Sequence, residues 1–108
     1  MKPAQPPVQT KAEVVARLRQ LQPALQALGV VRLGLFGSFV RDEATLDSDV
    51  DVLVDFEEGR KTYRALCAVG DLLEETLGRR VEVLTRAGLS PFIGPSILNS
   101  VEDVLTAA

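Results

Sequence analysis

The stretch GLFGSFVRDEATLDSDVDVLV, residues 34–54, decides the fold. It connects two segments that have the composition of β-strands. Residues 30–36 are rich in β-branched and aromatic side chains and lie between two glycines, which is typical of a strand. In residues 50–56, apolar side chains alternate with mostly acidic ones. This alternation predicts a strand with one apolar face and one acidic face.

A helical region is predicted before these strands. Thr10 and Glu13 have the spacing of a capping box, and apolar residues then recur at helical spacing until Gly29, which ends the helix. Pro23 interrupts this pattern, so we expect a kink or two abutting helical segments.

The rest of the chain adds a long helix, a third strand and a last helix. The long helix is predicted over about residues 60–77, with Tyr63 and Cys67 on its apolar face, and the strand over residues 80–84. An amphipathic helix is expected over residues 96–105. This order of elements predicts an α/β (α+β) fold, in which helices cover mainly one face of a small three-stranded mixed sheet.

Length and composition limit the function. The chain has 108 residues, which is enough for one domain. We expect a flexible lead-in over residues 1–9 and a single folded domain over residues 10–108. With 0 His and 1 Cys, the chain cannot build a histidine-based catalytic triad, a histidine metal site, a cysteine zinc site or an internal disulfide.

The charge and hydropathy patterns argue against two kinds of partner. The formal net charge of −3 is unlike that of duplex nucleic-acid binders, which carry basic patches. No uncharged run is long enough to cross a membrane, and the prolines near the N-terminus are atypical of a signal peptide. We therefore expect a cytoplasmic protein that binds neither membranes nor duplex nucleic acid.

Asp49 and Asp51 are the candidate metal ligands. Residues two apart on a strand share one face, about 7 Å apart at Cα, so their carboxylates would repel each other if left unpaired. Mg²⁺ or Mn²⁺ removes this repulsion, since both prefer oxygen ligands and complete their shell with water and phosphate. Glu82, on the face of the third strand away from its valines, could supply a third carboxylate.

A phosphate site is predicted beside these carboxylates. Ser38 follows the first strand and is expected to cap a short helix over residues 38–44, whose N-terminus would favour anions. Arg41, one turn later, could contact phosphate oxygens. Together these features are typical of metal-assisted phosphoryl or nucleotidyl transfer. Arg79 and Arg80 are instead expected to be charges at a helix end.

Two other interpretations of the acidic residues are open. Asp47, Asp49 and Asp51 have the spacing of the first three calcium ligands of an EF-hand. Glu58 falls at the twelfth position of that loop, but Val52 stands where the loop needs glycine. The acidic residues could also line a solvated strand edge that forms no site.

The joint pattern resembles a known family. Gly37-Ser38 after a strand, a short arginine-bearing segment, and Asp49-x-Asp51 at the start of the next strand resemble the minimal nucleotidyltransferases of the DNA polymerase beta-like superfamily. The likeness extends over most of the chain. It implies that Gly37 and Ser38 contact the nucleoside triphosphate. It also implies that Asp49 and Asp51 are catalytic metal ligands and that Glu82 completes the site.

The resemblance implies a function and a partner. The activity would be metal-dependent transfer of AMP (or another nucleoside monophosphate) from ATP (or another nucleoside triphosphate) to a hydroxyl group, with Mg²⁺ or Mn²⁺ as cofactor. Proteins of this family are commonly paired with a small helical HEPN-type protein as antitoxin and toxin, and some adenylylate that partner on a tyrosine. Because the chain has no residues left for an acceptor domain, we expect such a partner to present the acceptor hydroxyl. Association with a second copy of the chain is a further expectation.

The sequence departs from the family pattern at three positions. Phe39 stands where arginine is frequent, Asp42 where glycine is frequent, and Glu82 where aspartate is usual. These departures favour an alternative function, a non-catalytic module of the same fold that neutralises its partner sterically. Phe92 and Ile93 lie among prolines and glycine, so they are expected either to form an exposed contact patch or to cap one end of the sheet.

Overall fold

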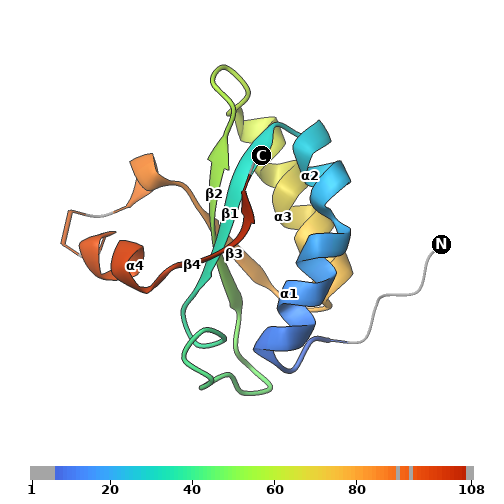
Figure 1. Cartoon of the computed structure of the whole chain (residues 1–108), viewed down its shortest axis with the longest axis vertical. Helices are drawn as coiled ribbons and strands as arrows, with labels where there is room; N and C mark the ends of the chain where they lie inside the picture. Colours follow the sequence, from blue (N-terminus) through green and yellow to red (C-terminus); the bar gives the residue numbers. More distant parts are fainter. Residues whose placement is uncertain (1–6, 90, 93, 107–108) are drawn as a thin grey trace.

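The computed structural model describes residues 7–89, 91–92 and 94–106. Within these residues, three helices cover one side of a four-stranded sheet, and a short helix and a 3₁₀ turn lie on the other side (Figure 1). The elements are, in chain order, α1 (Lys11–Gln20), α2 (Gln22–Ala27), β1 (Val30–Phe36), β2 (Val50–Phe56), α3 (Tyr63–Leu77), β3 (Val81–Leu84), η1 (Arg86–Gly88), α4 (Gly94–Ser100) and β4 (Glu102–Thr106).

The sheet is mixed, as predicted, with the order β3-β2-β1-β4. β1 is antiparallel to both of its neighbours, and β2 is parallel to β3. The predicted bounds of β1 and β2 are confirmed, and β3 begins one residue later than predicted. Because residues 50–56 form β2, they cannot belong to a calcium-binding loop, and the EF-hand interpretation is wrong.

The described part of the sheet has four strands, so the prediction of three is wrong. The predicted helix over residues 96–105 is split: α4 ends at Ser100, and β4 pairs with β1 from Glu102 onwards. Pairing supplies hydrogen-bond partners for an otherwise open edge of β1 and buries Leu105. The local hydrophobic pattern could not reveal this strand, because its partner lies far earlier in the sequence.

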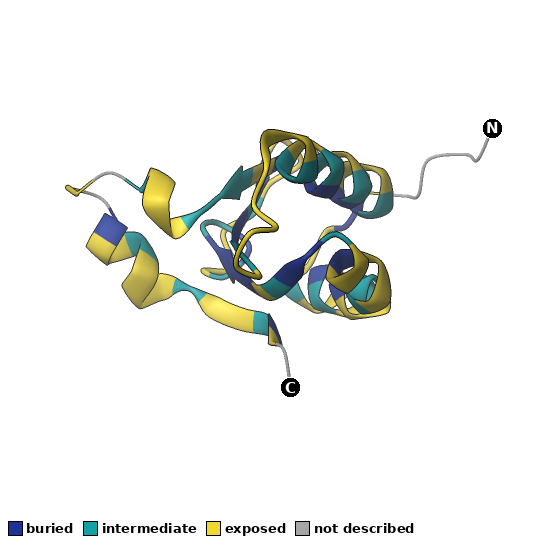
Figure 2. Cartoon of the chain, turned by 90° about the horizontal axis from the view of Figure 1, so that it is seen from above, coloured by how far each residue is buried: buried dark blue, intermediate teal, exposed yellow. Residues whose placement is uncertain are grey.

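The core lies between the sheet and helices α1, α2 and α3 (Figure 2). Val50, Val52 and Val54 of β2 face this core and are at most 1% exposed. Among the described residues, no polar or charged residue is buried. The helices contribute the apolar residues Val14, Leu18, Leu25, Val69, Leu73 and Leu77.

The helix α3 turns a different face to the core than the sequence predicts. Its buried residues are Val69, Leu73 and Leu77, which recur every four positions. Cys67 lies two positions before Val69, about 200° around the helix, and it is exposed. Tyr63, in the first turn, is 84% exposed. The predictions that Tyr63 and Cys67 are buried are therefore wrong.

The start of α1 and the break between α1 and α2 lie where the sequence predicts. The hydroxyl oxygen of Thr10 accepts a hydrogen bond from the backbone N–H of Glu13 at 3.2 Å, as expected of a capping box. Leu21 separates α1 from α2, and Pro23 lies in the first turn of α2. Before α1, Val8 is buried and its N–H donates to the carbonyl oxygen of Leu77 at 2.9 Å, so the packed part of the chain begins before residue 10. Among the described residues, no helix combines the length and apolar character that crossing a bilayer requires.

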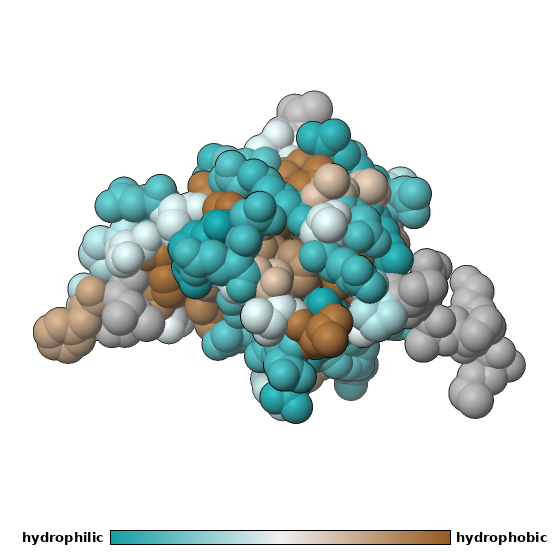
Figure 3. Space-filling view, turned by 90° about the horizontal axis from the view of Figure 1, so that it is seen from below, coloured by the Kyte–Doolittle hydropathy of each residue, from teal (hydrophilic) through white to brown (hydrophobic). Residues whose placement is uncertain are grey.

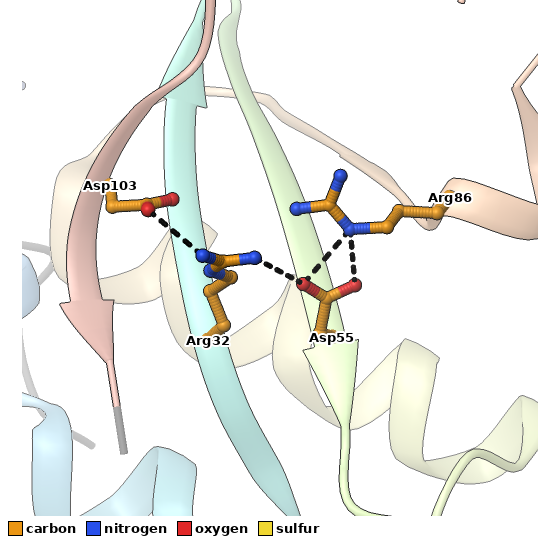
Figure 4. Close-up of polar contacts among 4 residues, drawn as sticks. All are labelled: Arg32, Asp55, Arg86 and Asp103. Atoms are coloured by element: carbon orange, nitrogen blue, oxygen red, sulfur yellow. Dashed lines mark hydrogen bonds and ion pairs between the residues drawn. The ribbon is translucent and has the colours of Figure 1, made fainter. Parts of the chain in front are cut away.

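Alternating charges cross the sheet face that lies away from α1, α2 and α3 (Figure 4). Arg32 of β1 lies 3.4 Å from the carboxylate of Asp103 on β4 and 4.0 Å from that of Asp55 on β2. Arg86 of η1 donates through Nε to both carboxylate oxygens of Asp55, at 3.1 and 3.2 Å. Each pair is partly exposed and contributes only about 0–1 kcal/mol. The row nevertheless links β4 and η1 to the two central strands.

Alanine should have opposite effects at Gly34 and Gly70. A Cβ at Gly34 would overlap with Cγ1 of Val101, so Gly34→Ala should lower the free energy of unfolding by about 1–3 kcal/mol. A Cβ at Gly70, inside α3, would meet only Cγ2 of Val83 at 3.9 Å. Gly70→Ala should raise the free energy of unfolding by about 0.5–1 kcal/mol, because alanine favours helix. Urea denaturation measures both, and a stabilising Gly34→Ala would contradict the packing of Val101 on β1.

Candidate active site

The connection between β1 and β2 begins at Gly37, directly against the carboxylate of Asp51. Phe36 and Asp51 are paired across β1 and β2, so the chain leaves β1 beside this carboxylate. Gly37 has a φ of +81°, and a Cβ there would overlap with Oδ2 of Asp51. Only glycine meets both conditions, so the backbone requires the glycine of the Gly-Ser pair at this place.

Glu82 lies beside Asp51. The two residues are paired in the parallel strands β2 and β3, so their side chains lie next to each other on the same face of the sheet. The pKa of Asp51 is raised to about 6, first by burial, then by hydrogen bonding with Glu82 when a proton is present and by the negative charges of Glu82 and Asp49, whereas the charge of Arg41 opposes the rise. The structure therefore brings four of the six predicted site residues into one electrostatic neighbourhood.

The two aspartates on the outer face of β2 have opposite surroundings. Asp55 lies against two arginines, whereas Asp51 faces two other acids. Neighbouring carboxylates are unfavourable unless a proton or a cation compensates them. Carboxylate oxygens are the donors that Mg²⁺ and Mn²⁺ prefer, so these residues fit the predicted divalent ion. Within the described residues, no group of three or more His, Cys, Asp or Glu is already arranged as a ligand set, so binding through all three carboxylates would require side-chain rotation.

The segment after Gly37 forms turns, so the prediction of a short helix over residues 38–44 is wrong. The N–H of Arg41 donates to the carbonyl oxygen of Gly37 at 3.2 Å, which closes a single helical turn. The turn stops because Asp42 has a φ of +59°, outside the right-handed helical region. Ser38 therefore caps no helix, although it lies next to Gly37 at the edge of the acidic cluster.

Two of the three departures from the family pattern have structural explanations. The φ of +59° at Asp42 favours glycine, but aspartate is among the side chains that tolerate it. Phe39 is 1% exposed and belongs to the core. The centroid of its ring lies 5.2 Å from the guanidinium carbon of Arg79, which is a cation–π distance.

Arg41 is the predicted cation of this site. Its Nε donates to the carboxylate of Glu43 at 3.1 Å, and both side chains are more than half exposed. An exposed pair of this kind contributes little to stability, so the guanidinium can exchange Glu43 for another anion at small cost.

Arg79 is not the exposed helix-end charge that the sequence predicts. Its Nη1 donates to the carbonyl oxygens of Thr45, Leu46 and Ser48 at 2.9, 3.2 and 2.9 Å. Its Nε donates to the carbonyl oxygen of Val8 at 2.6 Å. The sequence offers only two arginines after a helix-ending glycine, and that pattern does not distinguish an exposed charge from a guanidinium that anchors a loop.

A cavity of about 440 Å³ adjoins Asp49. It lies at the end of the molecule that carries the β1–β2 connection (Figure 1). Figure 3 views this end from below, and its surface is largely hydrophilic. Of the six predicted site residues, only Asp49 lines this cavity, so the cavity lies beside the carboxylate cluster and does not contain it. Its walls are formed by Pro7, Gln9, Leu46, Asp47, Ser48, Asp49, Gly78, Arg79 and Arg80.

Comparisons with known proteins assign a family. A family model described as a nucleotidyltransferase domain matches residues 12–104. A Methanocaldococcus jannaschii protein, provisionally named a protein adenylyltransferase, is 42% identical over 87 residues, covering 81% of this chain and 92% of the relative. The protein adenylyltransferase MntA of Thermococcus cleftensis is 41% identical over 76 residues, covering 70% of this chain and 76% of the relative.

Solved structures have the same fold. A structure provisionally identified as a minimal nucleotidyltransferase aligns with a TM-score of 0.76 and 34% identity, covering 87% of this chain and 95% of that one. The MNT antitoxin in complex with the tri-AMPylated HEPN toxin of Shewanella oneidensis aligns with a TM-score of 0.65, covering 91% of this chain and 74% of that one. At 13% identity, the second likeness is one of fold alone.

The raised pKa of Asp51 predicts a pH-dependent stability in metal-free buffer. A folded-state pKa of about 6, above the ordinary value of 3.8 for an aspartate, contributes stability at low pH that is lost as the pH rises through 6. Asp51→Asn carries no charge, so it should be more stable than the wild type at pH 8 by about 1 kcal/mol after allowance for solvent screening. The difference should shrink towards pH 4.

Urea denaturation in EDTA from pH 4 to pH 8 tests this prediction. Asp55→Asn is the matched control, because it removes a carboxylate from the same strand face that two arginines compensate. This control should not be stabilised at pH 8. If Asp51→Asn and the wild type have the same dependence of stability on pH, the carboxylates do not repel each other as described.

Proposed function

We propose, since this chain belongs to the family of nucleotidyltransferase domains, that it transfers AMP from ATP to a hydroxyl group on a partner protein. The observation that carries the proposal is the cluster of the carboxylates of Asp51, Glu82 and Asp49 beside Gly37, whose repulsion the charge of Arg41 only partly compensates. In the reaction, the hydroxyl oxygen bonds to the α-phosphorus of ATP and its proton is released. The bond from the α-phosphorus to the oxygen that bridges to the β-phosphate breaks, and pyrophosphate leaves.

The carboxylates are the proposed metal ligands. Asp49 and Asp51 would hold Mg²⁺ or Mn²⁺, and Glu82, which is paired with Asp51 across β2 and β3, would be the third carboxylate. When bound, the divalent ion would neutralise charge on the phosphate oxygens. Asp51 is turned to this face by the same alternation that buries its valine neighbours, so its position is fixed by the core.

Gly37, Ser38 and Arg41 are the proposed nucleotide-binding residues. Because Gly37 has no side chain, its backbone lies directly against the Asp51 carboxylate, so a triphosphate bound to this turn would lie next to that carboxylate. Arg41 is close enough to affect the pKa of Asp51, and its exposed contact with Glu43 can be replaced by a phosphate oxygen. The backbone of the turn and one exposed guanidinium would thus bind the phosphates without a helix N-terminus.

The acceptor is proposed to be a HEPN-type helical protein. The relatives above bear the name protein adenylyltransferase, and an MNT antitoxin of the same fold is solved in complex with an AMPylated HEPN toxin. The chain would then act as the antitoxin of a pair, in the cytoplasm.

Steric neutralisation without transfer is the alternative function. Three departures from the family pattern favoured it, but two of them have structural explanations. Phe39 is buried in the core. Asp42 has a positive φ, which explains why glycine is frequent at this position and which aspartate tolerates. Only Glu82 in place of aspartate still favours it. Glu82 nonetheless reaches Asp51, so its extra methylene does not separate the two carboxylates.

Transfer should depend on Asp51. The wild type, incubated with labelled ATP, Mg²⁺ and the proposed HEPN-type partner, should add AMP to that protein. Asp51→Asn should lower the rate at least about 100-fold, because several kcal/mol of metal-dependent stabilisation are lost. It should also lose Mg²⁺–ATP binding in calorimetry while its circular dichroism stays unchanged.

Asp55→Asn again serves as the matched control and should transfer AMP at nearly the wild-type rate. If Asp51→Asn binds Mg²⁺–ATP as the wild type does, the assigned site is wrong. If the wild type transfers no AMP and still neutralises its partner, the steric alternative replaces the proposed activity.

Phe92 is proposed to contact the partner. It is 91% exposed, which contradicts a role as a cap buried on the sheet end, whereas Ile93 lies outside the described residues. Phe92→Asp should abolish association with the HEPN-type protein or a second copy, and shift thermal unfolding by only a few degrees. Tyr63→Asp, which changes another large exposed side chain at 84% exposure, should leave association intact. Size-exclusion chromatography with light scattering measures association, and unimpaired association of Phe92→Asp would refute the contact.

A further inference from the structure

The guanidinium of Arg79 contacts three separate segments around the candidate site. Arg79 lies between Gly78, which ends α3 with a φ of +69°, and the start of β3. Its side chain is partly buried, and within the described residues it donates hydrogen bonds to four backbone carbonyl oxygens. It therefore fixes the path of the main chain by direct contact.

The first segment is the loop that leads to Asp49. Nη1 of Arg79 donates to the carbonyl oxygen of Ser48 at 2.9 Å, directly before Asp49. Directly after Asp49, the N–H of Val50 donates to the carbonyl oxygen of Arg80 at 3.0 Å. Asp49 is thus held on both sides by the residue pair 79–80.

The loop before Asp49 has hydrogen bonds of its own, and Arg79 donates to one of the carbonyl oxygens that take part in them. The N–H of Thr45 donates to the hydroxyl oxygen of Ser48 at 2.7 Å, and the N–H of Ser48 donates to the carbonyl oxygen of Thr45 at 3.1 Å. That carbonyl oxygen also accepts from Arg79 at 2.9 Å. The loop is exposed to solvent at Thr45 and Leu46, so these bonds and the guanidinium set its shape without a large buried surface.

The second and third segments are the turn after β1 and the chain before α1. The ring of Phe39, the residue after Ser38, lies 5.2 Å from the guanidinium carbon. The carbonyl oxygen of Val8 accepts from Nε at 2.6 Å. One side chain therefore joins the proposed nucleotide-binding turn to the loop that carries a proposed metal ligand.

We propose that Arg79 is a positioning residue, which holds Asp49 and the Gly37-Ser38 turn in register so that metal and nucleotide meet the same site. The proposal rests on the proposed function for its consequence, but the contacts themselves are independent of it. A lysine would supply one ammonium group where the arginine supplies a rigid planar fork, so it could reach only part of these acceptors.

Arg79→Met should loosen the loop and weaken metal binding. Backbone amides of residues 46–50 should exchange hydrogen at least about 10-fold faster, whereas amides in the centres of β1 and β2 should keep their protection. Calorimetry should show about 10-fold weaker Mn²⁺ affinity, the usual size of an effect from a residue that orients a ligand. Arg79→Lys should fall between Arg79→Met and the wild type in both measurements.

Arg60→Met is the matched control. Arg60 also donates to a backbone carbonyl oxygen, that of Ala27 at 2.8 Å, but it does so at the opposite end of β1 and β2. This variant should leave the exchange at residues 46–50 and the Mn²⁺ affinity unchanged even if it lowers the melting temperature. Equal losses in Arg60→Met and Arg79→Met would show a general effect of stability and overturn the proposal.

The remaining outcomes separate the two proposals. Unchanged exchange at residues 46–50, or unchanged Mn²⁺ affinity, in folded Arg79→Met overturns the positioning role. If Arg79→Met does not fold, Arg79→Lys decides by the same two measurements. If the variants behave as expected but the wild type transfers no AMP, the proposed activity fails and the positioning role stands.

Discussion

The alternation of side chains along β2 is the constraint on which the rest of the molecule depends. Val50, Val52 and Val54 are buried under the helices, and the same pleat turns Asp51 and Asp55 to the opposite face. A register shift of one residue would put the carboxylates into the core, where unpaired charge is strongly unfavourable. Packing the core therefore also places the acidic site.

Charge is compensated unevenly along this outer face. At one end, Asp55 lies between two arginines, and the row of ion pairs continues to β4. At the other end, Asp51 is paired with Glu82 across β2 and β3, and its pKa rises to about 6 because of burial and the neighbouring negative charges. Repulsion between the carboxylates at the acidic end lowers the free energy of unfolding, as is common at functional sites. A bound cation would reduce this repulsion and raise the free energy of unfolding again.

The backbone around the acidic end is shaped by contacts between distant segments. The connection between β1 and β2 contains no helix or strand, and it depends on the missing side chain at Gly37, the positive φ of Asp42 and the hydrogen bonds of Arg79. This arrangement suits a small domain, because one guanidinium can fix several carbonyl groups without an additional core. The same guanidinium explains why an aromatic side chain at Phe39 is compatible with the site.

The sequence alone determined the elements with strong local signals. Periodicity and local chemistry predict the bounds of β1 and β2, the capping box at Thr10 and the break near Pro23. They also predict that Glu82 points away from the valines of its strand, whereas its pairing with Asp51 depends on the strand order. Tertiary structure alone decided the rest. Residues 102–106 form β4 because they pair with the edge of β1 and satisfy its backbone hydrogen-bonding groups. Packing on the sheet decides which face of α3 is buried. The side chain of Arg79 turned inward because it bonds carbonyl groups about 30 and 70 positions away in sequence, a distance over which no local pattern carries information.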